Sequence, residues 1–366
     1  MKAAVLEKAG VPLLVENIRE PKPRQGEVLV KVAACGVCHT DLHVMKGEVT
    51  FPLPAVLGHE ISGTVAAVAP DVADARVGDR VIGSFIMPCG RCRHCVRGRD
   101  DLCETFFALN RLKGVLYDGE TRLFREYGSP LAMYSMGGLA EYAVVPATSV
   151  FPLPQGLDLH EACILGCAIP TAYGAVRHQA DLAPGESVAV IGVGGVGSNI
   201  VQIARLFGAA EVIAVDINDE KLEAARSLGA THVVNASDDD PATMVRALTG
   251  GRGVDVAFEA LGRAETVLTA FNVVADGGRV VVVGIAPGSE AVPIEITRLV
   301  RRSITLKGSY GGRMRADVPE LTRLAASGQI RTSQLITRRY SLDEVNDAYD
   351  ALNRGEIIGR AIIVVE

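Results

Sequence analysis

The sequence predicts an α/β protein in which a β-rich part is followed by a parallel sheet, and two observations support this prediction. Residues 1 to about 160 are punctuated by Gly and Pro and contain short apolar runs, such as 26–32 and 61–68, typical of strands bounded by turns. From Ser187 onward, apolar runs alternate with helical stretches at the spacing of βαβ units. A chain of 366 residues is long enough for two domains.

The elements of the second part follow from local periodicity. Apolar runs of strand length alternate there with stretches whose apolar residues recur every three or four positions, and one such stretch stops at Gly229. From about Ser309 the pattern becomes mixed and ends in a strand at 361–365. The strands expected before that point are 187–191, 212–215, 232–234, 254–258 and 279–283, with helices at 198–207 and 220–228 among them.

Composition and charge exclude several classes of protein. A net charge of −6 argues against a nucleic-acid binder, which needs a basic surface to neutralise phosphates. No run approaches 18 uninterrupted apolar residues, so no membrane span is expected. The first residues alternate as a strand does and lack a signal-peptide profile. Eight cysteines are therefore better explained as metal ligands and buried thiols than as disulfides, and a cytoplasmic location is expected.

A glycine-rich turn predicts a dinucleotide site. The segment Gly192-Val193-Gly194-Gly195-Val196-Gly197 follows an apolar strand and precedes a helix, whose free N–H groups attract phosphates. Asp216 ends the next strand, where a carboxylate binds ribose hydroxyls. A structural turn followed by a helix-capping aspartate is the alternative. The order of strand, turn, helix, strand and acid favours the dinucleotide.

The same aspartate indicates which dinucleotide binds. A carboxylate at Asp216 repels the 2′-phosphate of NADP, and the next residues, Ile217 and Asn218, supply no compensating cation. NAD is therefore the expected cofactor. Lys221 is near enough to leave residual use of NADP open.

Four cysteines close in sequence predict a metal site. The pattern Cys89-x-x-Cys92-x-x-Cys95-x7-Cys103 is typical of a closed, tetrahedral and therefore structural zinc site. The neighbouring arginines are expected to lower the thiol pKa values. A disulfide or redox cluster and a zinc knuckle for nucleic acid are weaker alternatives. The arginines concerned are Arg91, Arg93, Arg97 and Arg99.

A second group of potential ligands is dispersed. Cys38, His59 and Cys167 lie far apart in the sequence, and each alone is most simply a core residue. Spacing does not unite them. If they met, two thiolates and one imidazole would leave a fourth zinc position open, which catalysis requires.

Taken together, the motifs GVCHTDLH, GHE, the four-cysteine lobe, GVGGVG and the C-terminal GRAII resemble those of the zinc-containing alcohol dehydrogenases of the medium-chain dehydrogenase/reductase superfamily. The resemblance covers nearly the whole chain. It implies a β-rich GroES-like catalytic domain at 1–168 with a zinc lobe at 89–103, a Rossmann doubly wound parallel sheet at 169–308 that binds NAD, and a return to the catalytic domain at 309–366.

The resemblance also implies roles for individual residues. Two zinc ions per chain are expected, the catalytic one held by Cys38, His59 and Cys167. Glu60 is similar to a carboxylate that approaches this metal, Asp41 to the group that orients the ligand histidine, Thr40 to the hydroxyl that takes the alcohol proton, and His43 to the base that ends the relay. The cofactor contacts it implies are His39, Thr171, Gly192, Gly194, Val196, Gly197, Asp216, Lys221, Ile285 and Arg360.

Considered without the resemblance, several of these residues fit other roles. Thr40 and Asp41 also fit a helix cap, and His43 fits a surface histidine. Cys163, four residues before Cys167, is a rival ligand.

The function implied is reversible hydride transfer between NAD and a primary aliphatic or aromatic alcohol or aldehyde, since the expected cleft positions Val49, Phe85 and Ile285 are apolar. Phe107 stands where glutathione-dependent formaldehyde dehydrogenases carry an arginine, which counts against a glutathione adduct. The alternatives are a semialdehyde reductase, which Arg111 or Lys113 facing the cleft would support, and a non-catalytic nucleotide-binding relative.

The expected assembly is a homodimer. The long segment 104–136 resembles an insertion found in dimeric members of the family. Strands at 291–296 and 303–310 are expected to join the subunits. Apart from this second copy and a small-molecule substrate, neither a nucleic-acid nor a membrane partner is expected.

Overall fold

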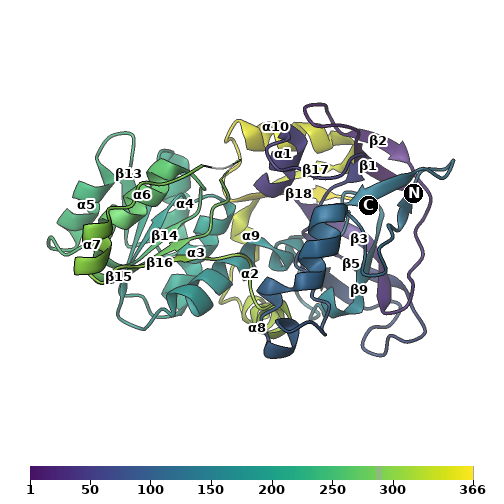
Figure 1. Ribbon diagram of the computed structural model, residues 1–366, viewed down its shortest axis with the longest axis horizontal. Coiled ribbons are helices and arrows are strands. Elements are labelled where there is room, and N and C mark those ends of the chain that lie inside the picture. Colours follow the sequence, from purple (N-terminus) through teal and green to yellow (C-terminus); the bar gives the residue numbers. More distant parts are fainter. Residues whose placement is uncertain (287, 289, 366) are drawn as a thin grey trace. The chain divides into compact units, whose positions relative to one another are not determined.

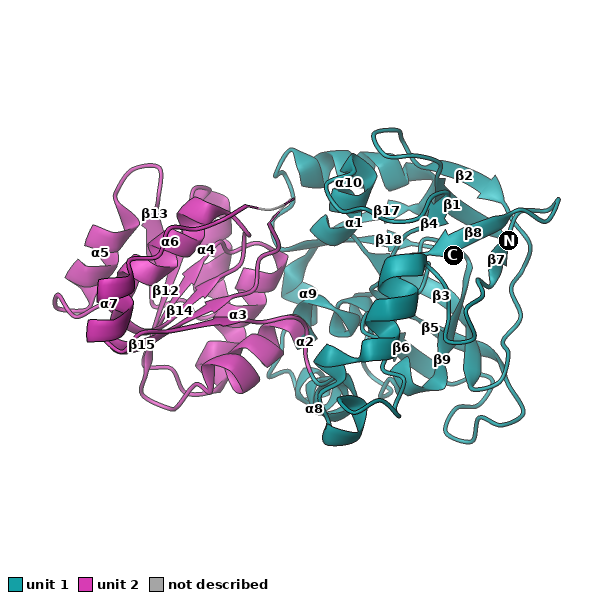
Figure 2. Ribbon diagram, in the orientation of Figure 1, with its two compact units in different colours: residues 1–170, 313–366 teal, residues 171–312 magenta. Residues whose placement is uncertain are grey.

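The computed structural model describes residues 1–286, 288 and 290–365. The chain forms two compact units (Figure 2). Unit 1 comprises Met1–Pro170 and Arg313–Glu366, and unit 2 comprises Thr171–Gly312. In the described part of the chain, no helix is both long and apolar enough to cross a lipid bilayer.

Unit 1 is built on two sheets, and the β-rich character that the sequence predicts for the first part of the chain is confirmed. The smaller has the strand order β2-β1-β4-β8-β7, with β1 (Lys2–Leu6), β2 (Leu14–Asn17), β4 (Ala55–Val56), β7 (Leu123–Phe124) and β8 (Pro130–Met133). The larger has the order β10-β6-β5-β3-β18-β17, and β9 also pairs with β3. Its strands are β3 (Glu27–Gly36), β5 (Ile61–Val68), β6 (Arg80–Gly83), β9 (Tyr142–Pro146), β10 (Val150–Pro152), β17 (Ile336–Ser341) and β18 (Arg360–Val364).

The last strand explains why the C-terminal residues belong to unit 1. Strand β18 is antiparallel to β3, with Ile363 opposite Cys35, and lies between β3 and β17 in the sheet whose strand β3 leads directly to Cys38. The helices α1 (His39–Lys46), α8 (Met314–Ala326), α9 (Thr332–Leu335) and α10 (Val345–Asn353) lie in unit 1, and α2 (Ala168–Tyr173) spans the boundary between the units (Figure 1).

Unit 2 is a six-stranded parallel sheet of order β13-β12-β11-β14-β15-β16. The order reverses between β11 and β14, so right-handed crossovers place helices on both faces and open a crevice at the carboxyl ends of these two strands. Its elements are β11 (Ser187–Ile191), α3 (Gly195–Leu206), β12 (Glu211–Asp216), α4 (Asp219–Ser227), β13 (His232–Asn235), α5 (Pro241–Leu248), β14 (Val254–Glu259), α6 (Ala264–Val273), β15 (Val274–Val282), α7 (Ile296–Arg301) and β16 (Thr305–Gly308).

The sequence placed two segments of unit 2 incorrectly. Helix α3 begins at Gly195, three residues before the predicted start, because the glycine-rich segment itself forms the first turn despite its low helix propensity. The strand expected at 291–296 is absent from the described residues. Pro293 has no N–H for a ladder, and Ile296 begins helix α7 instead.

Candidate active site

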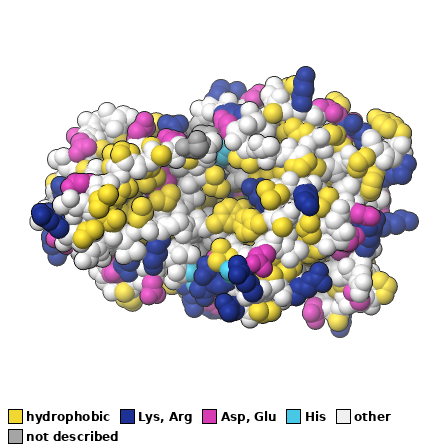
Figure 3. Space-filling view, in the orientation of Figure 1, with side chains coloured by type: hydrophobic (Ala, Val, Ile, Leu, Met, Phe, Trp, Pro, Cys, Tyr) yellow, Lys and Arg dark blue, Asp and Glu magenta, His cyan; other side chains and the backbone are white. Residues whose placement is uncertain are grey.

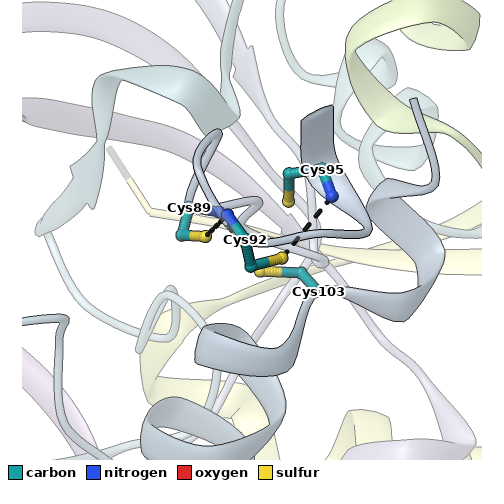
Figure 4. Close-up of side chains that lie close together, drawn as sticks. All are labelled: Cys89, Cys92, Cys95 and Cys103. Carbon is teal, nitrogen blue, oxygen red and sulfur yellow. Dashed lines mark hydrogen bonds between the residues drawn. The ribbon is translucent and has the colours of Figure 1, made fainter. Parts of the chain in front are cut away.

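The four cysteines of the lobe converge (Figure 4). Cys89 and Cys92 lie in the loop after β6, and short 3₁₀ turns carry Cys95 and precede Cys103. Their four sulfur atoms all lie within 4.8 Å of one another. Cys95 and Cys103 are buried, whereas Cys89 and Cys92 are partly exposed. Four thiols at this spacing fit one tetrahedral zinc ion with no open position.

Backbone N–H groups turn toward these sulfurs. Cys89 N donates to Cys103 Sγ at 3.2 Å, and Cys92 N donates to Cys89 Sγ at 3.3 Å. Burial of the Cys89 thiol opposes its ionisation, but hydrogen bonds from Thr105 and from the backbone of Arg91 and Cys92 outweigh it and lower the pKa to about 6. Part of the lobe is therefore ready to ionise before any metal arrives.

The lobe arginines act differently from the sequence-based expectation. Arg93 pairs with Glu104 at 2.7 Å and Arg99 with Asp101 at 2.7 Å, so nearby carboxylates balance their charge. Hydrogen bonds, one of them from the Arg91 backbone, rather than the charges of these arginines, lower the pKa of Cys89.

One residue that the sequence did not indicate anchors the lobe. Arg315, in α8, donates to the Cys95 carbonyl at 2.6 Å and to Asp100 Oδ1 at 2.7 Å, and Asp100 is buried. No sequence motif near Arg315 signals this contact, because it joins residues 215 positions apart.

The dispersed ligands also meet. Cys38 precedes α1, His59 and Glu60 lie between β4 and β5, and Cys167 precedes α2. One ligand atom from each of Cys38, His59, Glu60 and Cys167 lies within 4.8 Å of the others, and all four side chains are buried. Cys163 is buried as well but is not in this group, and burial raises its pKa well above the usual range.

Asp41 holds the histidine of this group. Its Oδ1 lies 3.1 Å from His59 Nδ1 and accepts the Gly58 N–H at 3.1 Å, while the Tyr349 hydroxyl donates to Oδ2 at 3.1 Å. Because Nδ1 faces Asp41, Nε2 is left to face the thiols. The helix-cap alternative for Asp41 is wrong, since Cys38 is the N-cap of α1 and no side chain caps it. Sequence reasoning missed Tyr349.

Glu60 is paired on one side only. Its Oε1 forms an ion pair with Arg360, which is 4% exposed, whereas its buried Oε2 accepts no hydrogen bond from the described residues. An orphaned carboxylate oxygen beside two thiols and an imidazole fits a site built for a cation.

The electrostatics of this group point the same way. Hydrogen bonding with Cys167, together with the nearby charges of His59 and Arg360, holds the pKa of the Cys38 thiol well below its usual range. Burial disfavours a charged His59, but Asp41 and Cys38 raise its pKa to about 10. The same negative groups would attract a zinc ion, which would bind the imidazole in place of this proton.

The expected relay residues lie on α1. Thr40 is half-buried, and its Oγ1 is 3.6 Å from Cys38 Sγ. His43, in the last turn of α1, is hydrogen-bonded through Nδ1 to Glu48 and keeps 23% of its side chain exposed. The His39 ring lies 6.5 Å from that of His43, measured between centroids. Glu48 is a further partner that the sequence did not indicate.

The glycine-rich turn of unit 2 is closely packed at two positions and open at a third. Gly192 has φ +85°, and a Cβ on Gly197 would lie 1.8 Å from Gly192 O, so both positions need glycine. A Cβ on Gly194 would meet nothing within 4 Å, which leaves room for a ligand at the N-terminus of α3. Val196 is partly exposed on the first turn of that helix.

Asp216 closes this turn from the neighbouring strand. Its Oδ2 accepts the Val193 N–H at 2.9 Å, and its Oδ1 accepts the Ile217 N–H at 2.8 Å. The carboxylate therefore fixes the turn and stands 9% exposed at the crevice.

The remaining expected cofactor contacts are spread over both units. Thr171, Lys221 and Ile285 belong to unit 2, with Ile285 40% exposed after β15. A Cβ on Gly262 would lie 2.5 Å from the Ile285 carbonyl, so the loops after β14 and β15 touch. His39 and Arg360 belong to unit 1.

Comparisons with known proteins agree with this geometry. Residues 24–155 match the family described as alcohol dehydrogenase GroES-like domain, and residues 195–327 match that described as zinc-binding dehydrogenase. The chain is 38% identical over 371 residues to the NDMA-dependent alcohol dehydrogenase of Amycolatopsis methanolica, a match that covers 99% of this chain and 98% of the relative.

Two further proteins extend the comparison. The S-(hydroxymethyl)glutathione dehydrogenase of Synechocystis sp. is 35% identical over 367 residues, covering 99% of both chains. The crystal structure of benzyl alcohol dehydrogenase from Acinetobacter calcoaceticus superposes with a TM-score of 0.93 at 32% identity, covering 100% of this chain and 99% of the other. The chain therefore belongs to the zinc-dependent alcohol dehydrogenases of the medium-chain dehydrogenase/reductase superfamily, with a GroES-like and a Rossmann domain.

Proposed function

We propose that this oxidoreductase transfers a hydride reversibly between NAD and a primary alcohol or its aldehyde. The observation that carries the proposal is the buried group of Cys38, His59 and Cys167, with Asp41 orienting the histidine. Two thiolates and one imidazole leave a fourth tetrahedral position for substrate. The four thiols of the lobe leave none, which suits a structural role.

The two bound groups would supply the reaction's chemistry. Cys38, His59 and Cys167 would hold zinc, which would supply a Lewis acid, and the glycine-rich turn would hold NAD, which would supply the hydride acceptor or donor. Asp41 keeps the His59 ring in one orientation, and Arg360 neutralises one oxygen of Glu60. The chain's own part in catalysis is thus to fix the geometry and move a proton.

The proton would leave through α1. The Thr40 hydroxyl lies beside the ligand Cys38, where it can accept a proton from a substrate hydroxyl and pass it outward. His43 is partly exposed and hydrogen-bonded to Glu48, which suits the last proton carrier before solvent. The simple surface role for His43 remains the alternative.

The preference for NAD rests on Asp216. This carboxylate stands at the edge of the crevice, and its charge disfavours the 2′-phosphate of NADP. Its position is fixed by backbone N–H donors, so it does not swing away. Lys221 is the nearest candidate for residual NADP binding, since its own N–H is bonded to Asn218 two residues after Asp216.

Aromatic side chains around His59 favour an apolar substrate. The rings of Phe85 and Tyr134 lie 6.1 and 5.9 Å from the His59 ring, and Phe51 packs edge-on against Tyr134 at 4.8 Å between centroids. A benzylic or aliphatic body would contact such a surface well.

One observation favours the second candidate, a semialdehyde or other carboxylate-bearing aldehyde. The Arg111 guanidinium lies over the Tyr134 ring, 4.6 Å from its centroid, and Tyr134 adjoins His59. A guanidinium on that aromatic cluster is suited to a substrate carboxylate.

We further propose a homodimer in a reducing compartment such as the cytoplasm. Strand β16 is an exposed sheet edge in which Leu306 is 42% exposed, and in the preceding helix α7 Ile296 and Val300 are 74% and 68% exposed. Figure 3 shows hydrophobic side chains gathered on unit 2. Leu306→Arg should convert a dimer to a monomer in light scattering, whereas a wild-type monomer would contradict the dimer.

The cysteines support the proposed compartment. All eight are free thiols, which suits a reducing location.

The direct test is the initial rate of cofactor reduction over a panel of alcohols with NAD⁺ and NADP⁺ in parallel. Benzylic and aliphatic primary alcohols with NAD⁺ should give the highest kcat/KM. Preferred turnover of ω-hydroxy acids would favour the second candidate. A protein that holds two zinc ions yet oxidises nothing in the panel would contradict the proposal.

A further inference from the structure

A second polar groove lies within unit 2, away from the glycine-rich turn. Its volume is about 460 Å³, and its walls come from the end of α5, the start of β15, and α7. These elements lie together at one end of unit 2 (Figure 2). The lining residues that matter here are Arg246, Arg252, Asp276, Arg298, Arg301 and Arg302.

The groove and the dinucleotide turn occupy opposite edges of the sheet. Val274, which lines the groove, is the first residue of β15, whereas Gly192 follows the last residue of β11. Strands β11, β14 and β15 are parallel, so their starts share one edge and their ends the other. A ligand in the groove is therefore not the cofactor.

Positive charge exceeds negative charge on the walls. Five arginines face two acids, Asp276 and Glu295, in a chain whose net charge is −6. Among the described residues, only Arg302 has a carboxylate partner, Asp276 at 2.6 Å. The Arg252 side chain makes a single long hydrogen bond, to Thr249 O at 3.4 Å, and the Arg301 side chain makes no hydrogen bond or ion pair with the described residues.

Two of the guanidinium groups converge. Arg246 Nη2 and Arg298 Nη2 both donate to the carbonyl of Asn272, at 2.9 and 3.1 Å. The two donating nitrogen atoms on this carbonyl oxygen are therefore at most about 6 Å apart, and among the described residues neither guanidinium forms an ion pair with a carboxylate. Burial, together with the charges of Arg246 and Arg302, lowers the pKa of Arg298, as expected for crowded like charges. An anion beside this pair would relieve the repulsion.

Helix ends explain part of this arrangement but not all of it. Arg246 is in the last turn of α5, and Arg298 and Arg301 are in the last turn of α7, where the helix dipole favours cations. That effect accounts for an arginine at each helix end. It does not account for guanidinium groups from two helices meeting at one carbonyl around a groove.

We propose that this groove binds a compact multivalent anion with at least two phosphate groups. A volume of about 460 Å³ suits a small molecule rather than an extended polymer. Each guanidinium presents a planar fork that matches phosphate oxygens, and Arg252 and Arg301 line the same groove as the pair formed by Arg246 and Arg298. The site is separate from the proposed active site and does not depend on it.

The test is calorimetric titration of the full-length protein with inorganic diphosphate, with and without saturating NAD⁺. Saturating NAD⁺ prevents diphosphate from binding at the glycine-rich turn. Diphosphate binding that persists in the presence of NAD⁺ is therefore binding at the groove. Arg301→Gln removes a cation whose side chain forms no hydrogen bond or ion pair with the described residues, so folding should be unaffected. Arg226→Gln in α4, which removes another exposed arginine of the same unit, is the control.

We expect one diphosphate to bind the groove with an affinity that falls as salt rises. Arg301→Gln should weaken the diphosphate affinity of the groove roughly tenfold, and the double variant Arg246→Gln/Arg301→Gln roughly a hundredfold. Arg226→Gln should change this affinity less than twofold. Absence of NAD⁺-insensitive binding in the wild type would overturn the proposal. Equal binding by the Arg301→Gln and Arg226→Gln variants would overturn it as well.

Discussion

The hydroxyl of Tyr349 donates a hydrogen bond of 3.1 Å to Asp41 Oδ2, although the two residues lie 308 positions apart in the chain. Both side chains are buried. Asp41 in turn holds His59, so the C-terminal helix α10 reaches the proposed zinc ligands through one carboxylate. The C-terminal return of the chain thus contributes a positioning group as well as strands.

Tyr349→Phe should weaken zinc at the catalytic site without emptying the lobe. Without the Tyr349 hydroxyl, the Asp41 carboxylate can rotate, and its hydrogen bond orients the His59 ring less well. We therefore expect the zinc affinity of this site to fall roughly tenfold. Chelator competition with metal analysis measures it. Asp41→Asn should have a larger effect. If Asp41→Asn keeps wild-type affinity, the positioning role is wrong.

Thr40→Ala should lower kcat by roughly 10² to 10⁴ because the substrate proton loses its first acceptor. Thr40→Ser retains a hydroxyl at the same place and should recover most of the rate. Steady-state kinetics with zinc content measured in parallel separates this from metal loss. Similar rates for the Ala and Ser variants would remove Thr40 from the relay.

Asp216→Asn should shift cofactor preference. The amide keeps one acceptor oxygen, so it can hold the N–H groups on only one side of Asp216, either that of Val193 or those of Ile217 and Asn218. It no longer repels a phosphate, so the NAD⁺ to NADP⁺ ratio of kcat/KM should fall roughly tenfold to a hundredfold. Glu220→Gln, which removes an exposed carboxylate four residues along, is the control and should leave the ratio unchanged. A shift of equal size in both variants would assign the effect to overall charge.

The capping box that precedes α10 gives a pH-dependent contribution to stability. The Ser341 N–H and hydroxyl both bond to Glu344 Oε2 at 2.8 Å, and the backbone bond followed by the hydroxyl bond lowers the pKa of Glu344. A lowered carboxyl pKa means that the stabilisation is fully present above the unfolded-state pKa and is lost as pH falls through the folded-state pKa.

Glu344→Gln should therefore lower the urea midpoint relative to wild type near neutral pH, and the difference should shrink on acidification toward about pH 3. Urea unfolding at several pH values checks this. A difference that stays constant with pH would show that the carboxylate charge makes no contribution.

Local patterns predicted much of unit 2 because each element there carries its own signal. The alternation at 187–191 and the spacing of apolar residues in 220–228 require no distant partner, and β11 and α4 (Asp219–Ser227) form close to these positions. The strand expected at 291–296 fails for the opposite reason, since an extended segment becomes a strand only beside another.

The candidate site shows the same division. The four cysteines of the lobe are close in sequence, so spacing alone indicated them. Cys38, His59 and Cys167 were united only by resemblance to a family, because their meeting depends on how unit 1 folds. Tyr349 and Arg315 were missed because neither lies near a motif and each acts on a residue more than 200 positions away.

The central claim, that Cys38, His59 and Cys167 hold a catalytic zinc, is tested most directly by comparing two thiols four residues apart. Cys167→Ser and Cys163→Ser make the same change at two buried positions, of which only Cys167 lies in the ligand group. Zinc content and NAD⁺-dependent oxidation of benzyl alcohol are measured on both variants. We predict that Cys167→Ser keeps only the lobe zinc and loses turnover, while Cys163→Ser keeps both zinc ions and its activity. Retention of both ions and full activity by Cys167→Ser would contradict the account.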